Sequence, residues 1–331
     1  MAYDRALISR ILRQMEQQRQ QHEAEAEERR YRLTHTIPRL GEIDRELRAT
    51  SAKAMRIAFE SNNTDSAIAA LRDRNLALQD EKRHILLENG YPADYLAVAC
   101  DCPACRDTGY VESGLCDCVR RRAAAEQKKD LSSLLPVDRE TFDTFRLDYY
   151  STQPDSRSGI SPREMAKFNY QKCSSFAETF GASYENLLLY GAAGLGKTFL
   201  SSCIARRVTE RGFSVTYDTA ISIFDQYNNA KFKSGDFSAA SQALARFRNA
   251  DLLIVDDLGT ELPGAFHTSC LYDLLSRRLM ARLPTILSTN LLPGELEGRY
   301  SAAIASRILG EFTQLRFIGD DIRKIRKKQR F

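Results

Sequence analysis

The sequence predicts an α/β domain built on a parallel β-sheet flanked by helices, preceded by a helical N-terminal segment and a small cysteine-rich module. After residue 186, short apolar runs typical of buried strands alternate with amphipathic helical segments, as a parallel sheet requires. Before residue 90, the apolar residues repeat at helical spacing instead. Five of the eight cysteines fall between Cys100 and Cys118. We therefore expect four parts, namely a helical segment (1–98), a cysteine module (99–122), a linker (123–140) and the α/β domain (141–331).

Length and composition indicate a globular protein of about two domains, at roughly 150 residues per domain. The chain has 331 residues, 43% of them hydrophobic, and a formal net charge of +4. This charge does not require a nucleic-acid partner, although the basic run at 323–330 is either a solvated tail or a phosphate contact. No apolar run reaches the ~18 residues of a membrane span, and the N-terminus has no signal-peptide core. We expect a cytoplasmic protein with no membrane partner.

The stretch between Asn186 and Leu200 joins a short apolar strand, a glycine-rich turn and the start of a helix. The turn reads Gly191-Ala-Ala-Gly-Leu-Gly-Lys-Thr198, which matches the full phosphate-loop pattern in its required context. Glycines let the backbone point its N–H groups at phosphate oxygens, and the helix adds its positive N-terminal end. Lys197 can reach the β- and γ-phosphates of ATP, and the Thr198 hydroxyl can bind Mg²⁺. The residues expected to bind the nucleotide are Gly191, Ala192, Ala193, Gly194, Leu195, Gly196, Lys197, Thr198 and Phe199.

Acidic and polar residues follow two of the later apolar runs. Asp256 comes after four apolar residues, the position at which a carboxylate holds the Mg²⁺ shell in such folds. Hydrolysis needs a second carboxylate to activate water, and either Asp257 or Glu261 can supply it. Asn290 ends the next apolar run, where its side chain is expected near the γ-phosphate. The sequence therefore predicts ATP hydrolysis but leaves the catalytic base open.

Arginines are needed to balance the charge of the transition state. The candidates after the last predicted strand are Arg299, Arg307, Arg316 and Arg323. Their spacing alone does not choose among them. Upstream, Phe142 and Phe145 lie three residues apart, and they either pack on an adenine ring or belong to the core, which is the more common role.

The cysteine stretch has the spacing of a structural zinc site. Cys102-x-x-Cys105 presents two thiolates, and Cys116-x-Cys118 completes a tetrahedral set across the intervening turn. In a reducing compartment such spacing favours metal over disulfides. Four sulfur ligands leave no open coordination position, so we expect Zn²⁺ to stabilise the fold of this module. Cys100 is a fifth candidate ligand.

The first 98 residues read as three helices, with breaks near Pro38 and near 61–64 and an end at Asn89-Gly90. An apolar stripe at the N-terminus is larger than so small a bundle needs. A self-contained helical bundle and a partner-binding module are both compatible with this pattern.

In their order, these motifs make the chain resemble the bacterial replicative-helicase loaders of the DnaC/DnaI type, which are AAA+ ATPases. The likeness is strongest to DnaI-like members that carry a cysteine module before the ATPase. It spans Cys102 to Arg323 and rests on CPACRDTGY, CDC, TFDTFRLDYY, GAAGLGKT, LLIVDDLGTE, LSTN, ASRILG and GDDIR. The N-terminal segment resembles the family only in being helical, without a matching motif.

The resemblance implies further roles. Arg307 would be a finger that reaches a neighbouring subunit's nucleotide, so that copies assemble into an ATP-bridged oligomer. Arg323 would be a sensor that binds the nucleotide of its own subunit. The helical segment would grip the hexameric replicative helicase, and the ATPase domain would handle single-stranded DNA. Phe224 and Tyr227 lie where relatives of this class extend an insertion toward DNA.

One position departs from the wider AAA+ pattern, because Asp257 stands where most members have glutamate. This keeps the base open between Asp257 and Glu261 and suggests slow turnover. Two other functions compete with helicase loading. One is an IstB-like transposition helper that binds duplex DNA, although such helpers usually lack a zinc module and long N-terminal helices. The other is an adaptor that binds ATP without hydrolysing it.

Overall fold

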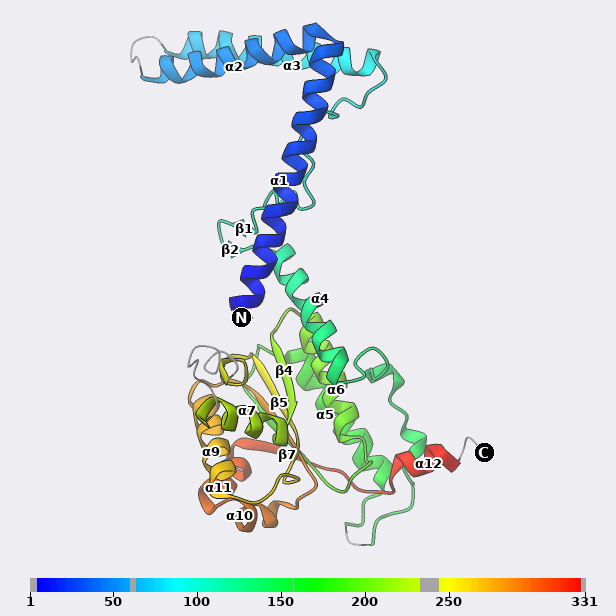
Figure 1. Ribbon diagram of the computed structural model, residues 1–331. Helices are drawn as coiled ribbons and strands as arrows, with labels where there is room; N and C mark the ends of the chain where they lie inside the picture. Colours follow the sequence, from blue (N-terminus) through cyan, green and yellow to red (C-terminus); the bar gives the residue numbers. More distant parts are fainter. Residues whose placement is uncertain (1–4, 60–63, 157, 233–243, 329–331) are drawn as a thin grey trace. The chain divides into compact units, whose positions relative to one another are not determined.

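The computed structural model describes residues 5–59, 64–156, 158–232 and 244–328 (Figure 1). The chain divides into two compact units, and each is treated by itself. One unit is Leu12–Cys116, and the other comprises Met1–Ile11 together with Asp117–Phe331. None of the helices in the described ranges has an apolar stretch long enough to cross a bilayer.

The Leu12–Cys116 unit is mainly helical, which confirms the expected N-terminal segment. Its helices are α1 (Arg5–Thr36, beginning in the other unit), α2 (Pro38–Phe59) and α3 (Thr64–Glu88). A small apolar cluster joins them around Leu33, Leu40 and Leu86. Between α2 and α3, Lys82 pairs with Asp44 at 2.6 Å, and Arg39 pairs with Glu81 at 2.7 Å. The break near 61–64 includes residues 60–63, which lie outside the described residues.

A parallel five-stranded sheet forms the centre of the second unit, as the alternating strand and helix signals predict. The strand order is β4-β5-β6-β3-β7, and all neighbouring pairs are parallel. The strands are β3 (Asn186–Tyr190), β4 (Val215–Thr219), β5 (Leu252–Leu258), β6 (Thr285–Thr289) and β7 (Phe312–Arg316). The helices of this unit include α4 (Asp117–Leu134), α5 (Pro162–Thr179), α6 (Lys197–Glu210), α7 (Ala220–Phe232), α9 (Ala265–Met280), α10 (Leu296–Arg299), α11 (Ala302–Glu311) and α12 (Ile322–Lys328). Residues 244–249 are helical as well. Short 3-10 turns occupy Phe142–Thr144, Leu147–Tyr149 and Pro293–Glu295.

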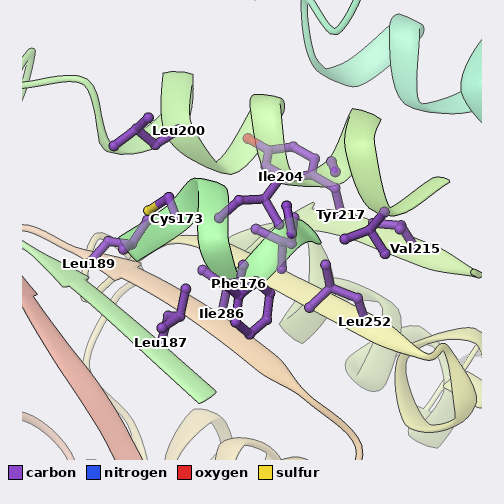
Figure 2. Close-up of a cluster of buried hydrophobic side chains, with 14 of the residues drawn as sticks. Cys173, Phe176, Leu187, Leu189, Leu200, Ile204, Val215, Tyr217, Leu252 and Ile286 are labelled. Atoms are coloured by element: carbon purple, nitrogen blue, oxygen red, sulfur yellow. The ribbon is translucent and has the colours of Figure 1, made fainter. Parts of the chain in front are cut away.

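Alternate residues of each strand supply two separate cores, one on each face of the sheet. On the first face, Leu187, Leu189 and Leu252 pack against α5 and α6 (Figure 2). Leu131 of α4 belongs to the same core. On the second face, Leu188 and Leu253 pack against α7, α9, α10 and α11. Burying one such side chain contributes about 1.5–3 kcal/mol. Because both faces are covered, the central strands β3 and β5 contain continuous apolar runs, which the sequence shows directly.

Two parts of this unit differ from the sequence-based expectation. The chain after Gly298 was expected to be only helical, but β7 forms there and pairs with β3. Its residues Phe312-Thr-Gln-Leu-Arg316 include three polar side chains, because an edge strand is less buried. The segment 123–140, expected to be a linker, contains most of α4, and its Leu131, Leu135 and Val137 are buried in the core.

Candidate nucleotide-binding site and cysteine cluster

The phosphate-loop residues connect the carboxyl end of β3 to the first turn of α6. Gly191 N donates to Thr289 O of the neighbouring strand β6 at 3.2 Å. This bond joins the loop to the carboxyl-terminal end of the sheet, called the sheet edge below. Gly196, with φ of 94°, turns the chain immediately before Lys197 begins the helix. The first N–H groups of a helix have no acceptor within it and are available to an anion. The loop therefore has the geometry that the phosphate-loop motif predicts, a tight turn that leads into a helix N-terminus.

Close packing explains why a glycine is needed at two loop positions. Gly194 has a φ of 77°, and a side chain there would overlap the carboxylate of Asp321, just before α12. Ile322 N also donates to Gly194 O at 3.0 Å. At Gly191, with a φ of 142°, a side chain would overlap the carbonyl group of Phe317, just after β7. The C-terminal part of the chain thus lies directly on the loop.

Lys197 is buried and has three acceptors around its ammonium group. Its Nζ donates to Gly191 O at 2.6 Å, Ala192 O at 2.8 Å and Asn290 Oδ1 at 2.9 Å. Burial lowers the pKa of Lys197 to about 8, against an opposing effect of Asp257 and Asp256. The structure thus brings together Lys197 and Asn290, two residues that the sequence predicted for one site.

Asp256 is buried at the end of β5, and both its carboxylate oxygens accept hydrogen bonds. Oδ2 accepts from Thr198 Oγ1 at 2.9 Å and from the Tyr217 hydroxyl at 2.8 Å. Oδ1 accepts from the Ser288 hydroxyl and from Asp257 N. The contact with Thr198 joins the two residues expected to hold Mg²⁺. Sequence reasoning missed Tyr217 and Ser288, because nothing in a single strand's pattern shows which residue of a neighbouring strand it faces.

Asp257 and Glu261, the two candidate bases, have opposite environments. Asp257 is exposed and adopts a left-handed conformation with φ of 53°, at a shift in the pairing of β5 with β6. Desolvation by nearby protein atoms and the charge of Asp256 raise its pKa, while Lys197 and Arg323 lower it. Asp257 can therefore receive a proton from a molecule at the sheet edge.

Glu261 is buried, at 5% exposure, and its carboxylate is already engaged. It accepts from Gly259 N at 2.9 Å, from the Tyr300 hydroxyl at 2.6 Å and from Arg299 Nη2 at 3.3 Å. These contacts anchor the turn after β5 to α10. The contacts of Glu261 are therefore structural, and Arg299 is its counter-ion.

Among the remaining arginines, Arg323 is close to the loop and Arg307 contacts a different element. Arg323 is the second residue of α12, and its charge adds to the lowering of the Lys197 pKa and partly offsets the raised pKa of Asp257. Arg307 on α11 lies over the Tyr272 ring of α9, 4.3 Å from its centroid, and donates to the Tyr272 hydroxyl at 2.8 Å. Arg316 is in β7, where its carbonyl group accepts from Asn169 at 2.7 Å.

The aromatic candidates pack on the two cores, Phe142 and Phe145 as half-buried residues and Phe224 and Tyr227 as buried ones. Phe142 and Phe145 both contact Tyr170, and the Phe145 ring centroid also lies 5.6 Å from that of Phe199 in the first turn of α6. On α7, Phe224 and Tyr227 are buried in the second core, at 2% and 7% exposure. Their rings are packed against other side chains, so neither is a surface aromatic. The following segment, 233–243, lies outside the described residues.

Comparison with known proteins decides the family. The model of the IstB-like ATP binding protein family matches residues 159–329, which is more than half of the chain. The chain belongs to this family. The match contains the phosphate loop, Asp256, Asn290, Arg307 and Arg323, so these site residues lie in an ATP-binding domain.

Curated relatives of this IstB-like protein include two helicase loaders. The replicative helicase loader DnaC of Escherichia coli (strain K12) is 26% identical over 148 residues, covering 41% of this chain and 60% of the relative. The loader DnaI of Bacillus subtilis (strain 168) is 25% identical over 143 residues, covering 42% and 44%. The chain thus spans 60% or less of the length of these relatives. A solved DnaC helicase loader aligns with a TM-score of 0.44 at 18% identity, covering 54% of this chain and 97% of that one.

Outside the family match, four buried cysteines form a cluster that could hold a metal ion. The sulfur atoms of Cys102, Cys105, Cys116 and Cys118 all lie within 4.8 Å of one another. Four thiolates at about 2.3 Å from a zinc ion would lie roughly 3.8 Å apart, and the Cys102 and Cys116 sulfurs are 3.8 Å apart. The donor set and spacing therefore fit a tetrahedral metal. Cys100 is exposed and is not part of the cluster.

The backbone around the cluster is shaped by Asp107. This residue is buried in a left-handed conformation, and its carboxylate accepts from Asp101 N at 2.8 Å and from Cys102 N at 2.9 Å. A short hairpin of β1 (Tyr110–Val111) and β2 (Gly114–Leu115) then returns the chain to Cys116. The Cys102–Cys105 turn and the hairpin bring the two cysteine pairs together.

Proposed function

We propose that this protein is a Mg²⁺-dependent ATPase that loads a replicative DNA helicase onto single-stranded DNA. The observation that carries the ATPase part is the linkage of Lys197 to Asn290 and of Thr198 to Asp256, beside the exposed carboxylate of Asp257. The relatives named as helicase loaders support the cellular role. Membership of an ATP-binding family supports the ligand.

In this proposal each residue at the sheet edge has a role in binding or hydrolysis. The backbone N–H groups of residues 191–199 bind the phosphates, and Lys197 exchanges its loop carbonyls for phosphate oxygens. Thr198 and Asp256 hold Mg²⁺, which would neutralise charge developing on the phosphate oxygens. Asn290 orients the attacking water or the γ-phosphate. Lys197 and Asn290 are already hydrogen-bonded to each other, and so are Thr198 and Asp256, so each pair is preorganised before ATP binds.

We infer that Asp257 is the general base. Its carboxylate is exposed at the edge that carries Lys197, whereas the Glu261 oxygens accept from Tyr300, Arg299 and Gly259. A base must be reachable by the attacking water, and the Glu261 side chain is buried, whereas Asp257 is exposed. Glu261 then serves to hold the turn that carries Asp257 against α10.

Two arginines would complete the site from different directions. Arg323 acts within its own chain, since its charge is felt at Lys197 and Asp257. Arg307 contacts Tyr272 and Ala303 on its own chain, and we propose that it acts on the nucleotide of a neighbouring copy. Hydrolysis would then require an assembled oligomer, and the binding and hydrolysis of ATP would control that assembly.

The remaining parts would provide partner binding and stability. We propose that the helical segment 1–98 grips the hexameric helicase and that the cysteine cluster binds Zn²⁺ as a structural ion. The helices carry many charged side chains and a limited apolar core, which suits a segment that completes its packing on a partner. Zinc would stabilise a stretch that has few apolar side chains of its own.

The loader function can be tested by placing purified replicative helicase on closed circular single-stranded DNA. Wild-type protein with ATP should increase the amount of helicase recovered on the circle, and Lys197→Ala should not. Equal recovery with and without the wild-type protein would contradict loading.

A second candidate function is a transposition helper, and the matched family itself favours it, because its description names IstB. Such a protein would bind duplex DNA in an ATP-dependent manner. Strong duplex binding without any helicase interaction would select this function. An adaptor that binds ATP without hydrolysis would be recognised by the absence of turnover in the wild type and in Asp257→Ala and Glu261→Ala alike.

A further inference from the structure

The carboxylate of Asp256 is held from both sides by hydroxyl groups of the neighbouring strands. The Tyr217 hydroxyl on β4 donates to Oδ2, and the Ser288 hydroxyl on β6 donates to Oδ1. All three side chains are buried, at 8% exposure for Tyr217, none for Ser288 and 2% for Asp256. A hydroxyl that donates to a buried carboxylate forms a charge-assisted bond, which is stronger than a neutral one.

The register of the sheet explains this arrangement. Tyr217 pairs with Ile254, two residues before Asp256, and Leu287 pairs with Val255, so Ser288 is adjacent to Asp256. Residues two apart on a strand share a face. Tyr217 and Ile286 belong to the core that packs on α6 (Figure 2). Ile254 belongs to the same core. Asp256 and Ser288 therefore project to the same face, where α6 supplies Thr198.

The two strand hydroxyls limit the orientations that the carboxylate can adopt. Oδ2 accepts from both Thr198 and Tyr217, while Oδ1 accepts from Ser288 and from Asp257 N. Rotation of the carboxylate would break bonds on both oxygens at once. The four hydrogen bonds therefore fix the direction of the carboxylate beside the Thr198 hydroxyl, whose own oxygen would bind Mg²⁺.

We infer that Tyr217 and Ser288 are positioning residues that set the Asp256 carboxylate for Mg²⁺ binding beside Thr198. This inference rests on the proposed Mg²⁺–ATP site and adds two residues that act through Asp256 rather than on the nucleotide. Groups that orient a metal-binding side chain commonly change metal affinity by about 10–100-fold when they are removed.

The test is the Mg²⁺ dependence of ATP affinity in the full-length protein, measured for wild type, Tyr217→Phe and Ser288→Ala. Tyr217→Phe should raise by about tenfold or more the Mg²⁺ concentration at which the increase in ATP affinity is half-complete, which is the Mg²⁺ midpoint. Affinity for ATP in EDTA should change by less than about twofold, because no phosphate contact is removed. Ser288→Ala should shift the midpoint in the same direction. Tyr227→Phe is the matched control, since it removes another buried tyrosine hydroxyl, on α7.

Thermal unfolding of each variant separates positioning from general stability. A lower melting temperature in Tyr217→Phe with an unchanged Mg²⁺ midpoint would overturn the inference, as would an equal midpoint shift in Tyr227→Phe. If Tyr217→Phe does not fold, an unchanged midpoint in Ser288→Ala overturns it instead. Wild-type ATP affinity that does not depend on Mg²⁺ would contradict the proposed metal site itself, and the inference with it.

Discussion

Lys197 Nζ donates a hydrogen bond of 2.9 Å to Asn290 Oδ1, which joins the start of α6 to the residue that follows β6. The two residues are 93 positions apart in the sequence and meet because β3 and β6 are neighbours in the sheet. This contact brings together Lys197, which we propose binds phosphate, and Asn290, the polar residue after β6. A γ-phosphate bound by Lys197 would therefore lie within reach of Asn290.

The lowered pKa of Lys197 predicts that ATP binding weakens at alkaline pH. The ammonium form binds phosphate, and burial lowers the pKa of this group to about 8. Below this value the lysine is charged before ATP arrives, so affinity should be nearly constant between pH 7 and 7.5. Above it the lysine must take up a proton on binding, and affinity should fall by up to about tenfold per pH unit. Lys197→Arg should bind more weakly with a flat profile over pH 7–9.5, because arginine stays charged. A wild-type profile as flat as that of Lys197→Arg would contradict this prediction.

Replacing the proposed base should stop hydrolysis while leaving ATP bound. Asp257→Asn keeps the shape of the side chain and removes its proton acceptor, so turnover should fall by about 100-fold or more. Glu261→Gln should act mainly on stability, because it weakens the buried contact with Arg299 and Tyr300. Turnover and thermal unfolding should be measured on both variants. A greater loss of turnover in Glu261→Gln, with unchanged unfolding, would reverse the assignment.

If Arg307 acts on a neighbouring copy, two inactive variants should restore activity when mixed. Arg307→Ala has an intact loop without the finger, and Lys197→Ala has the finger without a working loop. Mixed oligomers contain interfaces with both parts, so hydrolysis should recover to a fraction of the wild-type rate. Lys197→Ala mixed with Asp257→Asn is the control and should stay inactive, since both defects are in the same chain's site. Full activity of Arg307→Ala alone would exclude the finger role.

The cysteine cluster predicts which thiols are needed for bound zinc. Cys105→Ala should lose the metal, as measured by zinc content of the purified protein, and should lower resistance of residues 99–122 to proteolysis. Cys100→Ala should retain the metal, because Cys100 is exposed and outside the cluster of four. Loss of zinc in both variants would mean that Cys100 is a ligand after all, and metal-free wild-type protein would refute the site.

The sequence was most informative where one local pattern determines the outcome. Buried strands such as β5 are apolar runs, and the phosphate loop is a single continuous motif. The strand β7 was missed because an edge strand needs fewer apolar residues, and Gln314 and Arg316 resemble an exposed helix. Linker residues 123–140 were misread because α4 is polar on most of its surface and buries only a few side chains.

Contacts between distant strands also had no signature in the sequence. Tyr217 reaches Asp256 across 39 positions, and Glu261 meets Arg299 across 38. A pattern within one strand shows which residues alternate but not which residue of another strand they face. Glu261 thus appeared as a possible base, although tertiary contacts engage it elsewhere.

Co-elution with the host's replicative helicase tests the central claim most directly. Wild-type protein and a chain lacking residues 1–95 should be mixed with purified helicase, each with and without ATP. The account predicts ATP-sensitive co-elution of the wild type that is lost in the shortened chain. Absence of co-elution of the wild type in every nucleotide state would contradict helicase loading and would favour the transposition helper, for which duplex DNA binding is then the decisive assay.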